Sequence, residues 1–101
     1  MRKKQILEYL KTKVMATTRD VAIAIDMDYN NCKDILMELY FQGKIMAVDV
    51  HEYWPHSRKP SLVRYWFLPQ NKDKVKEFLE RQSDMKVIRW YIHEDKIPSL
   101  Y

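Results

Sequence analysis

The sequence has very little glycine and cysteine, and these scarcities exclude several classes of protein. Its one glycine, Gly43, rules out a glycine-rich phosphate loop and the dinucleotide-binding fingerprint, because both need several glycines. Its one cysteine, Cys32, cannot form an internal disulfide, which favours a reducing, cytoplasmic environment. No apolar run approaches the ~18 residues of a membrane span, and the basic start leads into a mixed-charge helix rather than a signal peptide. We therefore expect a soluble protein with no membrane partner, no cofactor and no small-molecule ligand.

The remaining composition is that of one globular domain whose charges are unevenly distributed. The 101 residues are 47% hydrophobic and 32% charged, with a net charge of +4. Residues 1–20 carry six basic and two acidic side chains, and residues 55–101 carry ten basic and six acidic ones. Residues 21–54 carry only two basic side chains against six acidic ones. Any nucleic-acid contact should therefore depend on the two basic ends, because phosphate attraction needs local positive charge.

Apolar spacing predicts three helices in the first half of the chain. Residues 2–13 carry one apolar stripe, and residues 18–25 follow a capping box formed by Thr17 and Asp20. Asp28 can cap a third helix, which should end near Gly43, where glycine accepts a left-handed conformation. In this helix Cys32 falls in an apolar position, which predicts a buried side chain rather than a metal ligand.

The second half predicts a β-hairpin followed by helix. Residues 44–54 and 62–69 are rich in β-branched and aromatic residues, and the alternation in the first run predicts a half-buried strand. Pro55 and Pro60 bound the turn between the two runs, and the apolar segment 14–16 could add an edge strand. The aromatic residues of the hairpin are expected to cover a core rather than stack on bases. Residues 71–92 are predicted to be helical, as one long helix or two shorter ones.

This order of elements resembles the winged helix-turn-helix fold. Val21-Ala22 followed by Ile25 is similar to the second helix of that family, and the apolar series of the third helix leads to Gly43-Lys44-Ile45, similar to its exit into the hairpin. The resemblance implies an α+β fold of three helices and a hairpin wing, with an additional C-terminal helix. It divides the chain into a winged helix-turn-helix domain, 1–69, and an extension, 70–101. Members are mostly DNA-binding transcription regulators, and a minority bind RNA or other proteins.

The resemblance implies candidate contacts to double-stranded DNA in three parts of the chain. The residues expected to read the major groove begin the third helix: Tyr29, Asn30, Asn31, Lys33 and Asp34. The residues expected to hold the wing in the minor groove are His56, Arg58, Lys59 and Arg64. The residues expected to contact phosphates are Arg2, Lys3, Lys4 and Arg19.

A homodimer is expected, because small duplex readers commonly bind two half-sites about 10 bp apart. The apolar positions of the C-terminal segment would form its interface: Val75, Phe78, Leu79, Met85, Ile88 and Ile92. The same stripe could instead pack on the first helix of its own chain.

Two further functions have to be weighed against DNA binding: docking on another protein, and catalysis. The acidic segment 21–54 opposes phosphate, and it favours the alternative of a winged-helix module that docks on another protein. Catalysis has no support, because no nucleophile stands at a recognisable spacing from a base, and the histidines and the lone cysteine lack the spacing of a zinc site.

Overall fold

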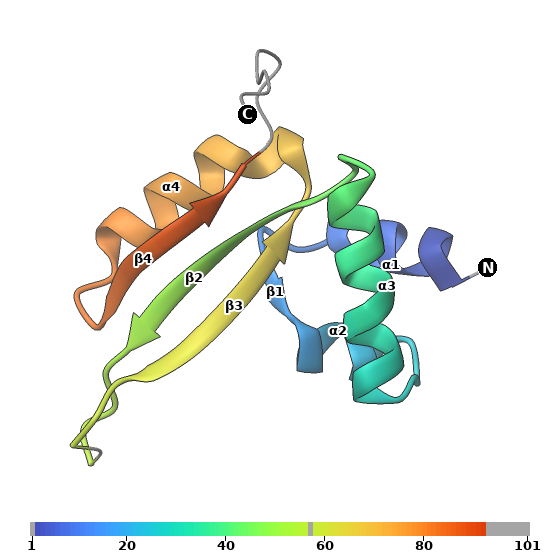
Figure 1. Ribbon diagram of the computed structural model, residues 1–101. Helices are drawn as coiled ribbons and strands as arrows, with labels where there is room; N and C mark the ends of the chain where they lie inside the picture. The colour runs from blue at the N-terminus through green and yellow to red at the C-terminus, as the bar shows by residue number, and fades with distance from the viewer. Residues whose placement is uncertain (1, 57, 93–101) are drawn as a thin grey trace, which may run out of the picture.

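The computed structural model describes residues 2–56 and 58–92, which form an α+β structure of helices and one antiparallel sheet (Figure 1). The helices are α1 (Arg2–Lys11), α2 (Thr18–Ala24), α3 (Tyr29–Phe41) and α4 (Lys72–Arg81), with a short 3-10 turn, η1, at Pro69–Asn71. The strands are β1 (Ala16–Thr17), β2 (Met46–Glu52), β3 (Ser61–Phe67) and β4 (Met85–Tyr91). Their order in the sheet is β1-β3-β2-β4, so β3 and β2 are central and β4 lies at an edge.

The signals that predicted the first three helices are confirmed. Thr17 Oγ1 accepts from the Asp20 N–H at 3.0 Å, and the Asp20 carboxylate accepts from the Thr17 N–H at 3.1 Å. Asp28 accepts from the Asn31 N–H at 3.2 Å and so caps α3. After α3 the chain turns at Gly43, whose φ of +77° lies in the left-handed region that glycine favours.

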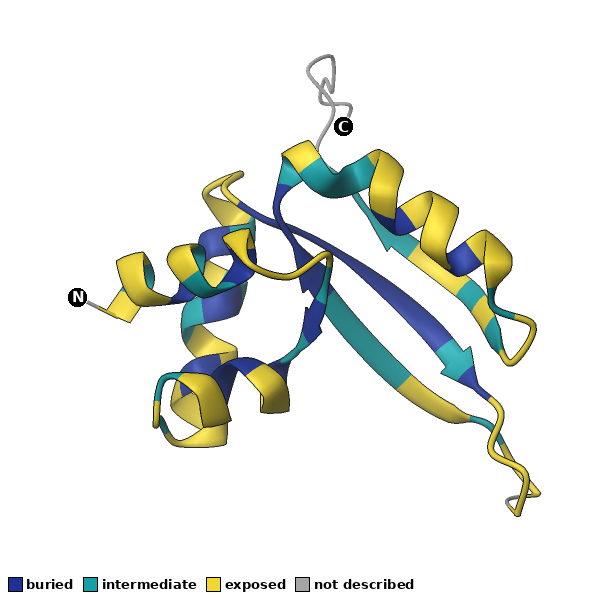
Figure 2. Cartoon of the chain, turned by 180° about the vertical axis from the view of Figure 1, so that it is seen from behind, coloured by how far each residue is buried: buried dark blue, intermediate teal, exposed yellow. Residues whose placement is uncertain are grey.

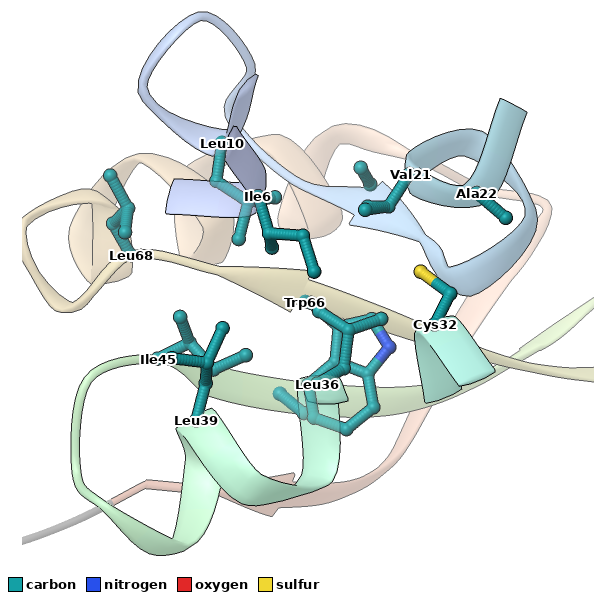
Figure 3. Close-up of a cluster of buried hydrophobic side chains, with 12 residues drawn as sticks. Ile6, Leu10, Val21, Ala22, Cys32, Leu36, Leu39, Ile45, Trp66 and Leu68 are labelled. Carbon is teal, nitrogen blue, oxygen red and sulfur yellow. The ribbon is translucent and has the colours of Figure 1, made fainter. Parts of the chain in front are cut away.

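The two faces of the sheet carry two separate cores. Ala47 and Trp66 point to the face that α1, α2 and α3 cover, and Figure 3 shows Trp66 among side chains from these helices. Val48 and Phe67 point to the opposite face, where they pack with Val75 and Leu79 of α4. Cys32 is fully buried in the first core, as predicted.

The prediction of a half-buried strand at residues 44–54 is wrong for β2. Figure 2 shows β2 buried along most of its length, and His51 is its one residue of intermediate burial. Helices cover one face of this strand and α4 covers the other, so both sets of alternating side chains lie inside.

The prediction of helix throughout residues 71–92 is wrong for the second half of the segment. Helix α4 ends at Arg81, and β4 pairs antiparallel with β2 through a register shift between Asp49 and Val50. The spacing of Met85, Ile88 and Ile92 fits a helix, but residues 85–91 also contain the β-branched and aromatic side chains that strands favour. Pairing with the central strand β2 decides between the two, and it places residues 85–91 in the same sheet as β2 and β3.

The predicted dimer stripe is largely used inside the chain. Val75 and Leu79 are buried in the core beneath α4, and Met85 and Ile92 pack against the same core. The stripe therefore packs on the sheet, rather than on α1. Phe78 and Ile88 are the two members of the predicted set that remain 40% and 47% exposed.

Candidate nucleic-acid interface

One groove brings together residues that the sequence assigned separately to the third helix and to the wing. It is a hollow of about 440 Å³ between α3 and the sheet, and we call it the α3–hairpin groove. Tyr29 and Lys33 line it from α3, where a spacing of four residues places two side chains on one helix face. Leu62 and Arg64 line it from β3, where a spacing of two places side chains on one sheet face. The other lining residues are Thr18, Met37, Asp49 and Trp66.

A network of polar side chains forms part of the wall of this groove. Arg64 donates from Nε to Asp49 Oδ1 at 2.7 Å and from Nη2 to Oδ2 at 3.0 Å, and the Tyr91 hydroxyl donates to the same Oδ2 at 3.0 Å. The Arg64 guanidinium also lies 4.6 Å from the centroid of the Tyr91 ring. The hydrogen bonds from Arg64 lower the pKa of Asp49 against the opposing effect of burial, and the same bonds raise the pKa of Arg64.

The pairing with Asp49 limits what Arg64 can offer to a phosphate. The Asp49 side chain is only 10% exposed, whereas that of Arg64 is 37% exposed. The guanidinium edge that remains accessible therefore belongs to a charge already balanced by a carboxylate. Lys33 contributes a cation to the same groove, and Tyr29 contributes an aromatic side chain that is 52% exposed.

The other residues predicted for the major groove lie on α3 but do not line the α3–hairpin groove. Asn30, Asn31 and Asp34 are all exposed. They occupy the first two turns of the helix, next to Tyr29 and Lys33 in the sequence. A ligand that enters along the start of α3 would therefore meet these polar groups beside the groove rather than within it.

The basic residues near the N-terminus separate into two groups. Lys3 of α1 forms an ion pair of 2.7 Å with Glu38 of α3, so it neutralises one of the acidic residues of that helix. Arg2 and Lys4 are exposed on α1. Arg19 of α2 instead lines a second hollow, of about 570 Å³, together with Tyr29, and therefore lies beside the start of α3.

The residues predicted for the wing tip lie far from the helices. His56, Arg58 and Lys59 are exposed in the connection between β2 and β3, which projects away from α1, α2 and α3 (Figure 1). They do not line the α3–hairpin groove, so Arg64 is the one residue of the predicted wing set that does.

Five residues that line the groove were not among the predicted contacts: Thr18, Met37, Asp49, Leu62 and Trp66. Asp49 stands in an apolar strand, and a carboxylate there is a signal for a buried ion pair. Trp66 donates from its indole N–H to Thr18 Oγ1 at 3.0 Å, and no sequence pattern links these two positions. Leu62 is 64% exposed on the β3 side of the groove.

The described part of the chain shows neither a metal cluster nor a membrane span. In residues 2–56 and 58–92, no three or more His, Cys, Asp and Glu side chains are grouped as a metal site would require. None of the helices in those ranges has the length and apolar character to cross a membrane. Burial raises the pKa of the Cys32 thiol, which lies 3.9 Å from the Thr18 carbonyl oxygen.

Comparisons with known proteins do not assign the chain to a family. No protein-family model matches it, and neither the curated proteins nor the solved structures contain a significant match.

Proposed function

We propose that the chain is a winged helix-turn-helix protein that binds double-stranded DNA, with the start of α3 in the major groove and the β2–β3 connection in the minor groove. The observation that carries this proposal is the α3–hairpin groove, to which both α3 and β3 contribute. The element order α1-β1-α2-α3-β2-β3, with a short β1 paired to β3, supports the fold assignment.

The basic residues around α3 and in the β2–β3 connection favour binding along the length of a duplex rather than to a single phosphate. Arg19 and Lys33 lie near the start of α3, and Arg58 and Lys59 lie in the β2–β3 connection. These cations at two separated places suit the phosphates of a duplex, whereas the carboxylates of α3 oppose binding. Glu38 of α3 is engaged locally by its ion pair with Lys3, and Asp28, just before the helix, is engaged as its cap.

The proposed protein acts as a homodimeric transcription regulator, in which two copies occupy two half-sites. With Val75 and Leu79 buried in the chain, such a dimer would use the outer side of β4, where Ile88 is exposed. Sedimentation of the wild-type chain and of Ile88→Asp tests this arrangement. A wild-type species of twice 12.4 kDa that Ile88→Asp converts to the monomer supports it, and a wild-type monomer at micromolar concentration contradicts it.

DNA binding is tested by fluorescence anisotropy with a labelled random duplex, titrated at low and at moderate salt. We expect micromolar binding that weakens steeply with salt. The double variant Arg58→Ala/Lys59→Ala should weaken binding to every sequence. It should also reduce the slope of log Kd against log salt concentration, here called the salt slope, by about one for each phosphate contact that is lost. Lys74→Ala/Arg81→Ala is the matched control, because it removes the same charge from exposed positions of α4, on the other face of the sheet.

The outcomes separate the proposal from its alternative. Equal loss of binding in both double variants would mean that net charge alone attracts the duplex, and it would contradict the proposed surface. No binding even at low salt would contradict DNA binding altogether. In that case the acidic residues of segment 21–54 would favour the protein-docking alternative.

A further inference from the structure

A third hollow lies on the other side of the sheet, away from the α3–hairpin groove. It has a volume of about 260 Å³ and is bounded by the end of β2, by β3, by α4 and by the turn before β4. Pairing of Glu52 with Met85 across the two strands and a 2.9 Å hydrogen bond from the Tyr53 N–H to the Asp84 carbonyl oxygen hold its sides together. We call it the aromatic hollow, and its lining residues are Glu52, Tyr53, Trp54, Tyr65, Phe78, Gln82, Asp84 and Met85.

Aromatic side chains form half of this lining, and three of the four are exposed. Trp54 is 55% exposed, Tyr53 is 46% exposed and Phe78 is 40% exposed. Tyr65 completes the set from β3 and packs against the core beneath α4. Large apolar side chains that gather around one exposed hollow, with polar groups at its rim, are typical of a binding site.

Two carboxyl groups lie in the same hollow, and neither has a cationic partner in the described part of the chain. Glu52 is only 9% exposed, and its carboxylate accepts a hydrogen bond from the Tyr65 hydroxyl. Asp84 lies in the turn between α4 and β4. Burial raises the pKa of Tyr65, and the hydrogen bond to Glu52 and the negative charges of Glu52, Asp20 and Asp84 raise it further. A buried carboxylate usually has a positive partner, so the hollow favours a cation.

The lining also indicates which kind of cation fits. The ions Mg²⁺ and Ca²⁺ require about six or more oxygen ligands, which two carboxyl groups and one amide do not supply. Aromatic faces attract a cation through the ring quadrupole, and they also accommodate methyl groups on its surface. A volume of about 260 Å³ is slightly below the ~300–1,000 Å³ of sites for drug-sized ligands, which favours a small head group.

We infer that the aromatic hollow binds a methylated ammonium group, with the rings of Tyr53, Trp54 and Phe78 around the cation and Glu52 and Asp84 balancing its charge. The group could come from a free choline-type molecule or from a methylated lysine side chain. This site lies on the α4 side of the sheet and is argued independently of the proposed DNA binding, although Tyr53 and Trp54 stand at the start of the β2–β3 connection.

The test follows the indole N–H resonances of the three tryptophans by NMR while choline is added. Trp54 lines the hollow, whereas Trp66 is 2% exposed in the other core and serves as an internal reference. We expect a saturable shift at Trp54 and none at Trp66. The uncharged carbon analogue of choline, 3,3-dimethylbutan-1-ol, should produce no saturable shift, and sodium chloride at equal concentration controls for ionic strength.

Variants connect the binding to the named residues. Trp54→Ala should raise the Kd for choline about fivefold, followed at the Tyr53 amide. Glu52→Gln keeps the shape and an acceptor for Tyr65, and it should raise the Kd about tenfold or more. Phe41→Ala, which removes an exposed ring elsewhere, should leave the Kd unchanged. A trimethyllysine peptide titrated in parallel distinguishes the two sources by its affinity relative to choline.

Two results would overturn the inference. One is an equal response to choline and to its uncharged analogue, which would mean that the hollow is only apolar. The other is the absence of a saturable shift at Trp54 with choline and with the trimethyllysine peptide. Because Trp54 is exposed, loss of binding in Trp54→Ala with an unchanged amide spectrum elsewhere would not reflect unfolding.

Discussion

Arg64 and Asp49 face each other across β3 and β2 and form a two-point salt bridge, with N–O distances of 2.7 and 3.0 Å. The two residues are direct partners in the strand register, so the backbone itself fixes their separation. The carboxylate is nearly buried, while the guanidinium keeps contact with solvent. Loss of Arg64 should therefore destabilise the fold more than loss of Asp49, because the carboxylate has little contact with water to replace its partner.

Arg64→Met should lower the free energy of unfolding by about 2–3 kcal/mol, because it leaves the nearly buried Asp49 carboxylate with the Tyr91 hydroxyl and the charge of Arg89 but without its ion-pair partner. The double variant Arg64→Met/Asp49→Leu should be closer to the wild type than Arg64→Met, since it removes the unpaired charge. Urea denaturation measures both. A double variant less stable than Arg64→Met would contradict this account of the pair.

The same pair predicts a dependence of stability on acid. The hydrogen bonds from Arg64 hold the pKa of Asp49 in the folded chain below 3.8, its ordinary value. A group with a lowered folded pKa stabilises the fold above its unfolded pKa, and it loses that contribution as the pH falls toward the folded value. Between about pH 5 and about pH 3, wild-type stability should therefore fall more than that of Asp49→Asn, measured by urea midpoints. Parallel curves would show that Asp49 carries none of the acid sensitivity.

Thr18→Val should destabilise the chain by about 1–3 kcal/mol, although valine has nearly the same shape. The Thr18 hydroxyl accepts from the Trp66 indole N–H at 3.0 Å, and both side chains are buried. Valine would leave that N–H without an acceptor in the first core. Thr18→Ser retains the hydroxyl and is the control, compared by thermal unfolding. A Thr18→Val variant as stable as the wild type would show that the bond from Trp66 to Thr18 adds nothing to the stability of the first core.

Gly43→Ala should cost about 1–2 kcal/mol through backbone strain alone. Gly43 has a φ of +77°, and an added Cβ would meet no atom within 4 Å, so no clash contributes. Gly43→Asn should cost less, since asparagine tolerates the left-handed region better than alanine. Chemical denaturation gives the comparison. An alanine variant as stable as the wild type would mean that the turn after α3 relaxes without loss.

Asn30→Ala should alter the sequence preference of DNA binding while the salt slope stays nearly unchanged. An asparagine that pairs with an adenine edge adds about 1–3 kcal/mol of discrimination at one base pair, and it carries no charge to release counterions. Selection of preferred sequences from a random duplex pool, for wild type and variant, measures this effect. Identical preferences would remove Asn30 from the proposed reading residues.

The sequence predicted the local structure well wherever a short-range rule determines it. The capping box at Thr17, the cap at Asp28 and the turn at Gly43 each depend on residues within four positions of one another. It failed for residues 85–91, where the same side chains suit a helix or a strand and pairing with β2, more than thirty residues earlier, decides.

The candidate site was predictable only as a set of separate residues. Side-chain type and helix position indicated Tyr29 and Lys33, but no pattern in the sequence could place them across a groove from Arg64. The partner of Arg64 was hidden for the same reason, since the bond to Asp49 follows from strand register. Exposure of Trp54 and Phe78 around one hollow depends on where α4 ends, which the prediction of helix, single or divided, across residues 71–92 left open.

The two cores draw on different lengths of the chain, and this has a consequence for synthesis on the ribosome. The buried residues of the first core all lie between Ile6 and Leu68, with Tyr91 also packed against them. The second core needs Val75 and Leu79, with Met85 and Val87 packed against it. At ~5–20 residues per second, the stretch between Leu68 and Ile92 takes roughly one to five seconds to emerge. During that interval α4 does not yet cover the sheet face that carries Val48 and Phe67. This apolar face is therefore exposed on a partly folded nascent chain, where it favours aggregation.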